Sequence, residues 1–189
     1  MMRQYELVER VTRYNPNADE NLLNKAYVYA MKKHGTQQRA NGDPYFSHPL
    51  EVAGILTDLK LDDATIAVAL LHDTIEDTNT TAEELRKRFG EAITQIVVDV
   101  TDDKNLEKQE RKRLQIEHAP HLSHEAKLVK LADKICNLRD VVATPPADWP
   151  LERRQEYFDW AKQVVDGLRG VHHKLEDVFD ATYGGRPNS

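Results

Sequence analysis

Apolar residues recur at intervals of three and four along most of the chain, which is the spacing of one face of an α-helix. No stretch gives a convincing hairpin signal. The pattern therefore predicts an all-α fold. Its main apolar positions are Tyr5, Val8, Val11, Leu22, Ala26, Val28, Ala30, Met31, Leu50, Val52, Ala53, Leu56, Leu59, Ala92, Ile93, Ile96, Val97, Val100, Leu128, Leu131, Ala132, Ile135 and Leu138.

Capping residues and prolines set the expected helix boundaries. Asn17 is a candidate N-cap for the second helix. Pro49 suits the first position of another helix, which puts His48 at its N-cap. Histidine is a poor N-cap, so this side chain is expected to have another task. Pro150 is expected to open one long helix that stops at Gly184.

The helical pattern is interrupted at Thr144-Pro145-Pro146, but the break is short and apolar residues continue beyond it. We therefore expect a helix-helix turn within one domain over residues 1–183. The length of 189 residues is sufficient for one domain with a sizeable core. Residues 184–189 are expected to form a disordered tail.

Composition narrows the class of protein. The sequence is 40% hydrophobic and 31% charged, as in an ordinary globular protein, and no apolar run approaches the roughly 20 residues that span a bilayer. The formal net charge of −6 argues against non-specific binding of nucleic acid. Cys136 is the only cysteine and the N-terminus lacks the apolar core of a signal peptide, so we expect a cytoplasmic protein.

The stretch from Leu70 to Thr78 places a histidine and several carboxylates directly after an apolar segment. On a continuous helix through Ile75, one face would be apolar and the polar side chains would share the other side. Like charges that close disfavour ionisation unless a cation compensates, so a divalent metal is one interpretation. An acidic, solvated helix end is the other, and this stretch alone leaves both open. The polar side chains are His72, Asp73, Glu76 and Asp77.

Other segments contain polar side chains that could join those of Leu70 to Thr78 in one site. Arg39 lies nine residues before His48, in a polar loop that is able to fold back over it. Asp133 follows an apolar run, as Asp73 does, and lies one helical turn before Asn137. A basic cluster either forms a salt-bridged exposed helix or offers one or two cations to a phosphate. This cluster consists of Lys108, Arg111, Lys112 and Arg113.

Two imidazoles and two carboxylates form a ligand set suited to Mn²⁺, Fe²⁺, Zn²⁺ or Mg²⁺. Helical bundles build such sites from inward-facing side chains of separate helices. Glu76 and Asp77 follow one turn later, where they could orient or deprotonate a metal-bound water. The candidate ligands are His48, His72, Asp73 and Asp133.

The full set of motifs is Arg39…His48-Pro49, His72-Asp73…Glu76-Asp77, Lys130-Leu131-Ala132-Asp133…Asn137-Leu138-Arg139, Val100-Thr101-Asp102-Asp103-Lys104, Glu110-Arg111-Lys112-Arg113-Leu114-Gln115 and Gln155-Glu156-Tyr157-Phe158. Taken together, these motifs resemble the HD-type hydrolase domain of the RelA/SpoT homologue family over roughly Ala26 to Tyr183. The stand-alone small alarmone hydrolases, such as the metazoan SpoT homologue, are the most similar group. One local departure is Lys134-Ile135-Cys136, where the long enzymes usually have Arg-Leu-His.

The resemblance implies a single-domain HD-type helical bundle with a metal site between its helices. It also implies an Mn²⁺-dependent hydrolase that cleaves the 3′-pyrophosphate from ppGpp or pppGpp, leaving GDP or GTP. The chain ends too soon for the synthetase domain of long family members, so we expect hydrolysis only. By the resemblance, the metal ligands are His48, His72, Asp73 and Asp133, the catalytic residues are Glu76 and Asp77, and the substrate-binding residues are Arg39, Asn137, Lys108, Arg153 and Tyr157.

Two other functions are possible interpretations of the same candidate site residues. A phosphohydrolase acting on another nucleotide, such as NADPH at its 2′-phosphate, would need the same metal site. A non-catalytic alarmone-binding protein would be expected to have a broken ligand set, whereas this set is intact. The expected partner is a small nucleotide, with neither nucleic acid nor membrane, and apolar residues of the C-terminal helix could serve a homodimer as well as the core.

Overall fold

The computed structural model describes residues 1–189, and its only regular elements are helices. One isolated antiparallel bridge joins Gln38 to Pro44. The all-α prediction is therefore confirmed. The helices are α1 (Gln4–Tyr14), α2 (Glu20–His34), α3 (Ser47–Asp58), α4 (Asp63–Leu71), α5 (Thr74–Asp77), α6 (Ala82–Phe89), α7 (Glu91–Val100), α8 (Lys108–His118), the 3-10 helix η1 (Ala119–His121), α9 (His124–Ala143), α10 (Leu151–Asp166) and α11 (His173–Tyr183).

Contacts group the chain into two compact units. The first contains residues 1–39 and 43–101, and the second contains residues 40–42 and 102–189. The first unit holds α1 to α7, and the second holds the helices from α8 onward. That residues 1–183 form one domain, followed by a disordered tail, stays a prediction. Within the second unit, Arg186 of the tail pairs with Asp159 at 2.8 Å.

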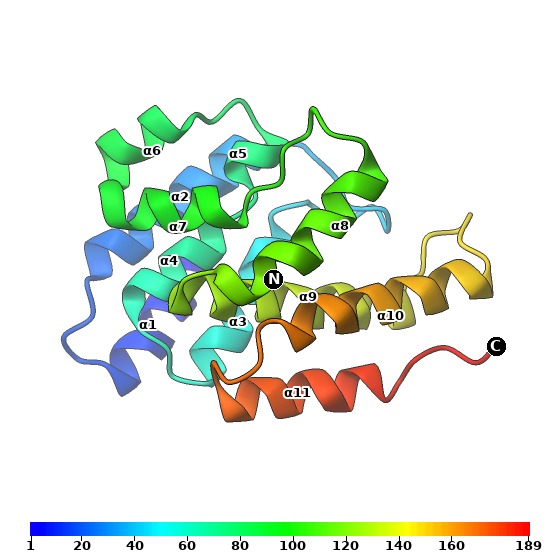
Figure 1. Ribbon diagram of the computed structural model, residues 1–189. Helices are drawn as coiled ribbons and strands as arrows, with labels where there is room; N and C mark the ends of the chain where they lie inside the picture. The colour runs from blue at the N-terminus through cyan, green and yellow to red at the C-terminus, as the bar shows by residue number, and fades with distance from the viewer. The chain divides into compact units, whose positions relative to one another are not determined.

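Helix α4 is the centre of the first unit. It packs against α2, α3 and α7, and Figure 1 shows it among these helices. Every residue from Thr65 to Leu71 is buried, because this helix is apolar on almost all sides. Burying one leucine or isoleucine side chain stabilises a fold by about 1.5–3 kcal/mol, so this short helix anchors the unit.

The predicted helix through Ile75 is wrong, because α4 ends at Leu71 and α5 begins at Thr74. Side chains bind the carbonyl oxygens that a continuing helix would use. The imidazole Nδ1 of His72 lies 2.6 Å from the carbonyl oxygen of Ala69. The Thr74 hydroxyl donates to the carbonyl oxygen of Leu71 at 2.7 Å. Side-chain hydrogen bonds of this kind compete with helix formation, so the chain bends at the histidine-aspartate pair.

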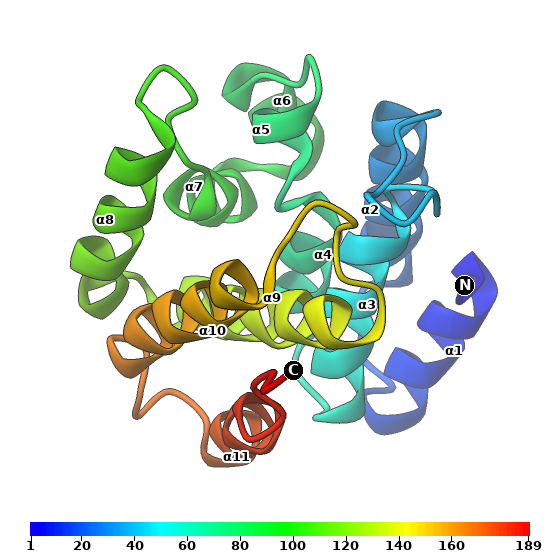
Figure 2. The same cartoon turned by 90° about the vertical axis from the view of Figure 1, so that its right-hand side faces the viewer.

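Helix α9 is the centre of the second unit, where it packs against α10 and α11, and α8 packs against α10. Figure 2 shows α9, α10 and α11 running close to one another. The apolar stripe predicted for α9 is buried along its length. Its buried members include Leu128, Leu131, Ala132, Ile135 and Leu138.

The single long C-terminal helix predicted from Pro150 to Gly184 is also wrong. Helix α10 ends at Asp166 and α11 begins at His173. Gly170 in the connection has φ +94°, which side chains rarely allow, and the ring of His172 caps α11 by accepting the N–H of Leu175. The connection therefore turns the chain where the periodic pattern had suggested continuity.

Two helix starts also differ from the predictions. Asp19, not Asn17, caps α2, and its carboxylate accepts the N–H of Leu22 at 3.0 Å. His48 is the second residue of α3 rather than its N-cap, because the helix begins at Ser47. The histidine is nevertheless buried at the start of that helix, as its unusual position suggested.

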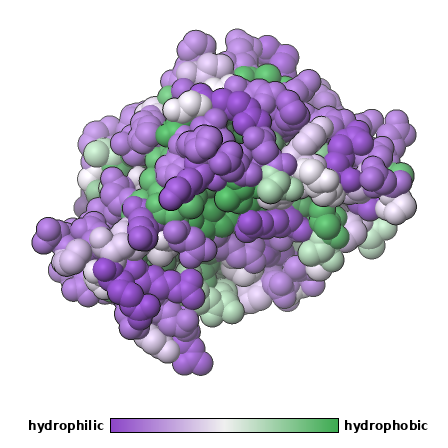
Figure 3. All heavy atoms as spheres, turned by 90° about the horizontal axis from the view of Figure 1, so that it is seen from below, coloured by the Kyte–Doolittle hydropathy of each residue, from purple (hydrophilic) through white to green (hydrophobic).

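The face drawn in Figure 3 is mostly hydrophilic, with smaller hydrophobic areas. None of the helices combines the length and the apolar character needed to cross a bilayer.

Replacing Asp19 by alanine tests the corrected helix start. We expect Asp19→Ala to lower the free energy of unfolding by about 1 kcal/mol, because α2 loses the acceptor at its first turn. Asn17→Ala is the matched control and should stay within about 0.5 kcal/mol of the parent protein. Urea unfolding followed by circular dichroism measures both, and an equal loss in the two variants would contradict the assignment.

Candidate metal centre

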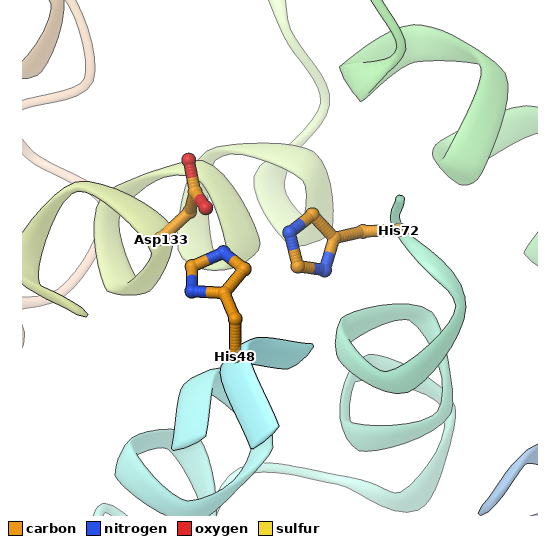
Figure 4. Close-up of side chains that lie close together, drawn as sticks. All are labelled: His48, His72 and Asp133. Atoms are coloured by element: carbon orange, nitrogen blue, oxygen red, sulfur yellow. The ribbon is translucent and has the colours of Figure 1, made fainter. Parts of the chain in front are cut away.

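Two histidines of the first unit face each other. His48 lies in the first turn of α3 and His72 directly follows α4, as Figure 4 shows. Their rings are nearly buried, with centroids 5.5 Å apart and an angle of 64° between the planes. A ring nitrogen of each lies within 4.8 Å of the other. Two imidazoles are thus held at a separation that a single cation could bridge.

The carboxylate of Asp73 completes this arrangement within the unit. Its Oδ2 atom lies 3.3 Å from Nε2 of His72 and 3.7 Å from Nε2 of His48. The contact with the Ala69 carbonyl requires His72 to carry its proton on Nδ1, because a carbonyl can only accept. Oδ2 of Asp73 lies beside the other ring nitrogen, Nε2, which carries a lone pair when the ring is neutral. A bound cation would turn this unfavourable approach of two acceptors into shared coordination.

Two further carboxylates belong to the same cluster. Glu76 and Asp77 lie on the single turn of α5, and one carboxylate oxygen from each of them lies within 4.8 Å of one oxygen of Asp73 and of each other. Like charges this close repel unless a cation or a hydrogen-bond donor lies among them. The bend after α4 therefore brings together the polar side chains that the sequence had placed on one continuous helix.

One donor in this cluster was not among the predicted site residues. The hydroxyl of Tyr45 donates to Oδ2 of Asp73 at 2.8 Å and lies 3.1 Å from Oδ2 of Asp77. The ring of His34 packs against this tyrosine with centroids 5.0 Å apart. Burial lowers the pKa of His34, which favours its neutral form. Only the position of Tyr45, three residues before His48, could have drawn attention to it in the sequence.

Arg39 stands at the edge of the same unit. Its guanidinium donates to the hydroxyl of Ser47 at 3.1 Å and pairs with Glu51 at 3.3 Å. The backbone of its loop is paired, because the N–H of Arg39 donates to the carbonyl of Asp43. The arginine is thereby tied to the start of the helix that carries His48, and its contact with substrate stays a prediction.

The second unit contains the remaining candidates. Asp133 lies on α9, where Figure 4 draws it, and is buried. Asn137, one turn later, donates to its Oδ2 atom at 3.3 Å. The ammonium of Lys134 lies 3.5 Å from the same oxygen and 4.3 Å from the ring centroid of Trp160. Burial lowers the pKa of this lysine, while the neighbouring Asp133 charge opposes that change.

An open cavity of about 570 Å³ in the second unit is lined by cations and aromatic rings. The guanidinium of Arg153 lies 4.3 Å from the ring centroid of Trp149, and the ammonium of Lys112 lies 5.6 Å from that of Tyr157. Burial, and then the charge of Asp133, raise the pKa of Tyr157, so its hydroxyl keeps its proton. The lining residues are Lys108, Gln109, Lys112, Trp149, Pro150, Glu152, Arg153, Glu156 and Tyr157.

The basic cluster on α8 is divided between two environments. Arg113 forms ion pairs with Glu110 and Glu117, as expected of a salt-bridged surface helix. Lys108 and Lys112 line the cavity instead. The salt-bridged surface helix is thus found at Arg113, whereas phosphate binding by Lys108 or Lys112 stays a prediction.

The predicted site residues fall into two groups, each described within its unit. The first unit brings together His48, His72, Asp73, Glu76 and Asp77. The second unit places Asp133 with Asn137 on α9, and Lys108, Arg153 and Tyr157 around the cavity.

Comparisons with known proteins place this chain in a family. Residues 26–159 match the family model of the HD domain. The chain is 52% identical to guanosine-3′,5′-bis(diphosphate) 3′-pyrophosphohydrolase MESH1 of Xenopus tropicalis over 168 residues, which cover 87% of this chain and 94% of that protein. The human protein of the same name is 51% identical over 161 residues, covering 83% of this chain and 90% of that protein.

A longer relative and a solved structure agree with this placement. GTP pyrophosphokinase rsh of Brucella ovis is 59% identical over 186 residues, which cover 94% of this chain but only 25% of that protein. A solved structure of a metazoan ortholog of SpoT that hydrolyses ppGpp superposes with a TM-score of 0.83 and 46% identity, covering 86% of this chain and 93% of that one. The chain therefore belongs to the HD domain family and, within it, to the RelA/SpoT homologues, as its motifs predicted.

Proposed function

We propose that this protein hydrolyses guanosine-3′,5′-bis(diphosphate), releasing pyrophosphate from its 3′ position. The observation that carries the proposal is the convergence of His48 and His72 on one oxygen of Asp73. The substrate follows from the MESH1 relatives, which carry the name of this hydrolase and match this chain over most of their length. The penta-phosphate pppGpp presents the same 3′ group and is included in the proposal.

An HD hydrolase domain implies a divalent metal ion, and the histidine-aspartate cluster of the first unit supplies donors that fit one. We propose Mn²⁺ as that ion and His48, His72 and Asp73 as ligands. We propose Asp133 as a fourth ligand because it occupies the matching position in the family's motif. When bound, such a cation would neutralise phosphate charge and lower the pKa of a coordinated water.

Glu76 would take the proton from the attacking water, and Asp77 would orient that water. Both carboxylates lie within 4.8 Å of Asp73, next to the proposed ligand set. The backbone of Asp77 is fixed, because the side-chain amide of Gln37 donates to its carbonyl oxygen at 2.6 Å. A carboxylate held at a fixed distance from the water is the arrangement that general-base catalysis needs.

A polyphosphate substrate also needs local positive charge, since the chain as a whole carries a formal charge of −6. Lys108 and Arg153 supply cations at the cavity of the second unit. The ring of Tyr157 forms part of the same wall. We propose that these side chains, together with Arg39 and Asn137, bind the nucleotide.

Product analysis tests the function directly. Purified protein is incubated with Mn²⁺ and ppGpp, with and without a chelator, and the products are resolved by ion-exchange chromatography. We expect GDP and pyrophosphate in equal amounts, and no product once the chelator is present. Cleavage to GDP with two molecules of phosphate would contradict the proposed bond. Turnover of NADPH at its 2′-phosphate, with ppGpp left intact, would contradict the proposed substrate.

Changes at Glu76 and Asp73 separate catalysis from metal binding. We expect Glu76→Gln to retain Mn²⁺ but to lower kcat about 100-fold or more, because the amide cannot accept the proton. Asp73→Ala should lose metal and activity together, because the two histidines lose the carboxylate that they face. Calorimetric titration with Mn²⁺ and initial rates with ppGpp measure the two properties.

Glu83→Gln provides the matched control, because Glu83 is an exposed carboxylate on α6 that pairs with Lys87 and is not a member of the cluster. This variant should match the parent protein in both measurements. Unchanged turnover in Glu76→Gln would remove Glu76 from the mechanism, and full Mn²⁺ affinity in Asp73→Ala would remove Asp73 from the ligand set.

A further inference from the structure

We propose that Tyr45 is a positioning residue of this centre, whose hydroxyl holds the carboxylates of Asp73 and Asp77 in a fixed relation. The inference rests on the proposed function for the roles of the two carboxylates. It goes beyond that function because it assigns a task to a side chain that neither touches the nucleotide nor ligates the metal in the proposal.

The tyrosine acts on the same oxygen atom that faces the histidines. Its hydroxyl oxygen lies 2.8 Å from Oδ2 of Asp73, and that oxygen is also 3.3 Å from Nε2 of His72. The same hydroxyl lies 3.1 Å from Oδ2 of Asp77. One O–H group is thus shared between a proposed metal ligand and a proposed catalytic carboxylate. Hydrogen bonds to ionised acceptors are roughly twice as strong as those between neutral groups.

The local backbone explains why such a donor is needed. Asp73 lies in the bend after α4, and Asp77 ends a helix of only four residues. A segment this short gives the carboxylates little fixed support, and their mutual repulsion favours separation. A neutral donor between them opposes the repulsion without adding a positive charge that would compete with the cation.

Tyr45 is itself held from several sides. Its backbone N–H donates to the carbonyl of Gln37 at 2.8 Å, and its ring packs against the buried ring of His34. Gln37 accepts from Nδ1 of His34 at 3.1 Å through Oε1 and donates through Nε2 to the carbonyl of Asp77 at 2.6 Å. The network therefore fixes Asp77 through its backbone and its carboxylate at once, and it links the tyrosine to both contacts.

Tyr45→Phe removes the hydroxyl and keeps the ring, so it separates positioning from packing. Tyr27→Phe is the matched control, because its hydroxyl donates to the carbonyl of Met2 and its ring packs against Phe46, next to Tyr45 in the chain. Both variants are compared with the parent protein by calorimetric Mn²⁺ titration without nucleotide and by initial rates with ppGpp. Thermal unfolding gives the temperature range in which each variant is folded, and the titrations are run below it.

We expect Tyr45→Phe to weaken Mn²⁺ binding about 10- to 100-fold, the usual effect of losing a hydrogen-bond partner of a metal ligand. Its kcat should fall about tenfold or more, with KM for ppGpp changed less than about threefold, because the tyrosine does not contact substrate in this account. Tyr27→Phe should leave all three values unchanged.

An Mn²⁺ affinity in Tyr45→Phe equal to that of Tyr27→Phe would overturn the inference, whatever the rates. The titration needs no substrate, so its result stands even if the parent protein fails to cleave ppGpp. Failure of the proposed function and failure of this inference are thus distinguishable.

Discussion

The close approach of one carboxylate oxygen of Asp73 to two imidazoles is the interaction on which the centre depends. Oδ2 lies 3.3 Å from Nε2 of His72 and 3.7 Å from Nε2 of His48, and it also accepts a hydrogen bond from the hydroxyl of Tyr45. A carboxylate oxygen and the lone pairs of two imidazoles repel one another at these distances unless a cation or a proton lies among them. Burial of these polar side chains destabilises the folded state unless hydrogen bonds or a cation compensate them.

The fold meets this constraint by ending a helix early. Helix α4 is buried on nearly every side, so its position is fixed by packing against α2, α3 and α7. The side chains of His72 and Thr74 then bind the last carbonyl oxygens of that helix and turn the chain. The packing of the apolar helix α4 thus fixes the position of the polar bend that follows it. The backbone of the bend is placed by the core beneath it, while the hydroxyl of Tyr45 contacts the carboxylates of Asp73 and Asp77.

Sequence patterns predicted the helices and the residue types of the centre, but not the bend or its donor. The apolar spacing continues through Ile75, so nothing in the periodicity reveals that side-chain hydrogen bonds end the helix at Leu71. Likewise, the apolar spacing continues on both sides of Gly170, so the pattern did not indicate the turn between α10 and α11. Tyr45 meets Asp73 across 28 residues of chain, and only tertiary packing brings them together.

Anomalous diffraction tests the central claim most directly. Crystals grown with Mn²⁺ would be measured at the manganese absorption edge, where the ion is located independently of any model of the side chains. The account predicts one strong anomalous peak, coordinated by His48, His72 and Asp73. Full occupancy of Mn²⁺ at another place, with His72 and Asp73 in direct contact and no peak beside them, would contradict it.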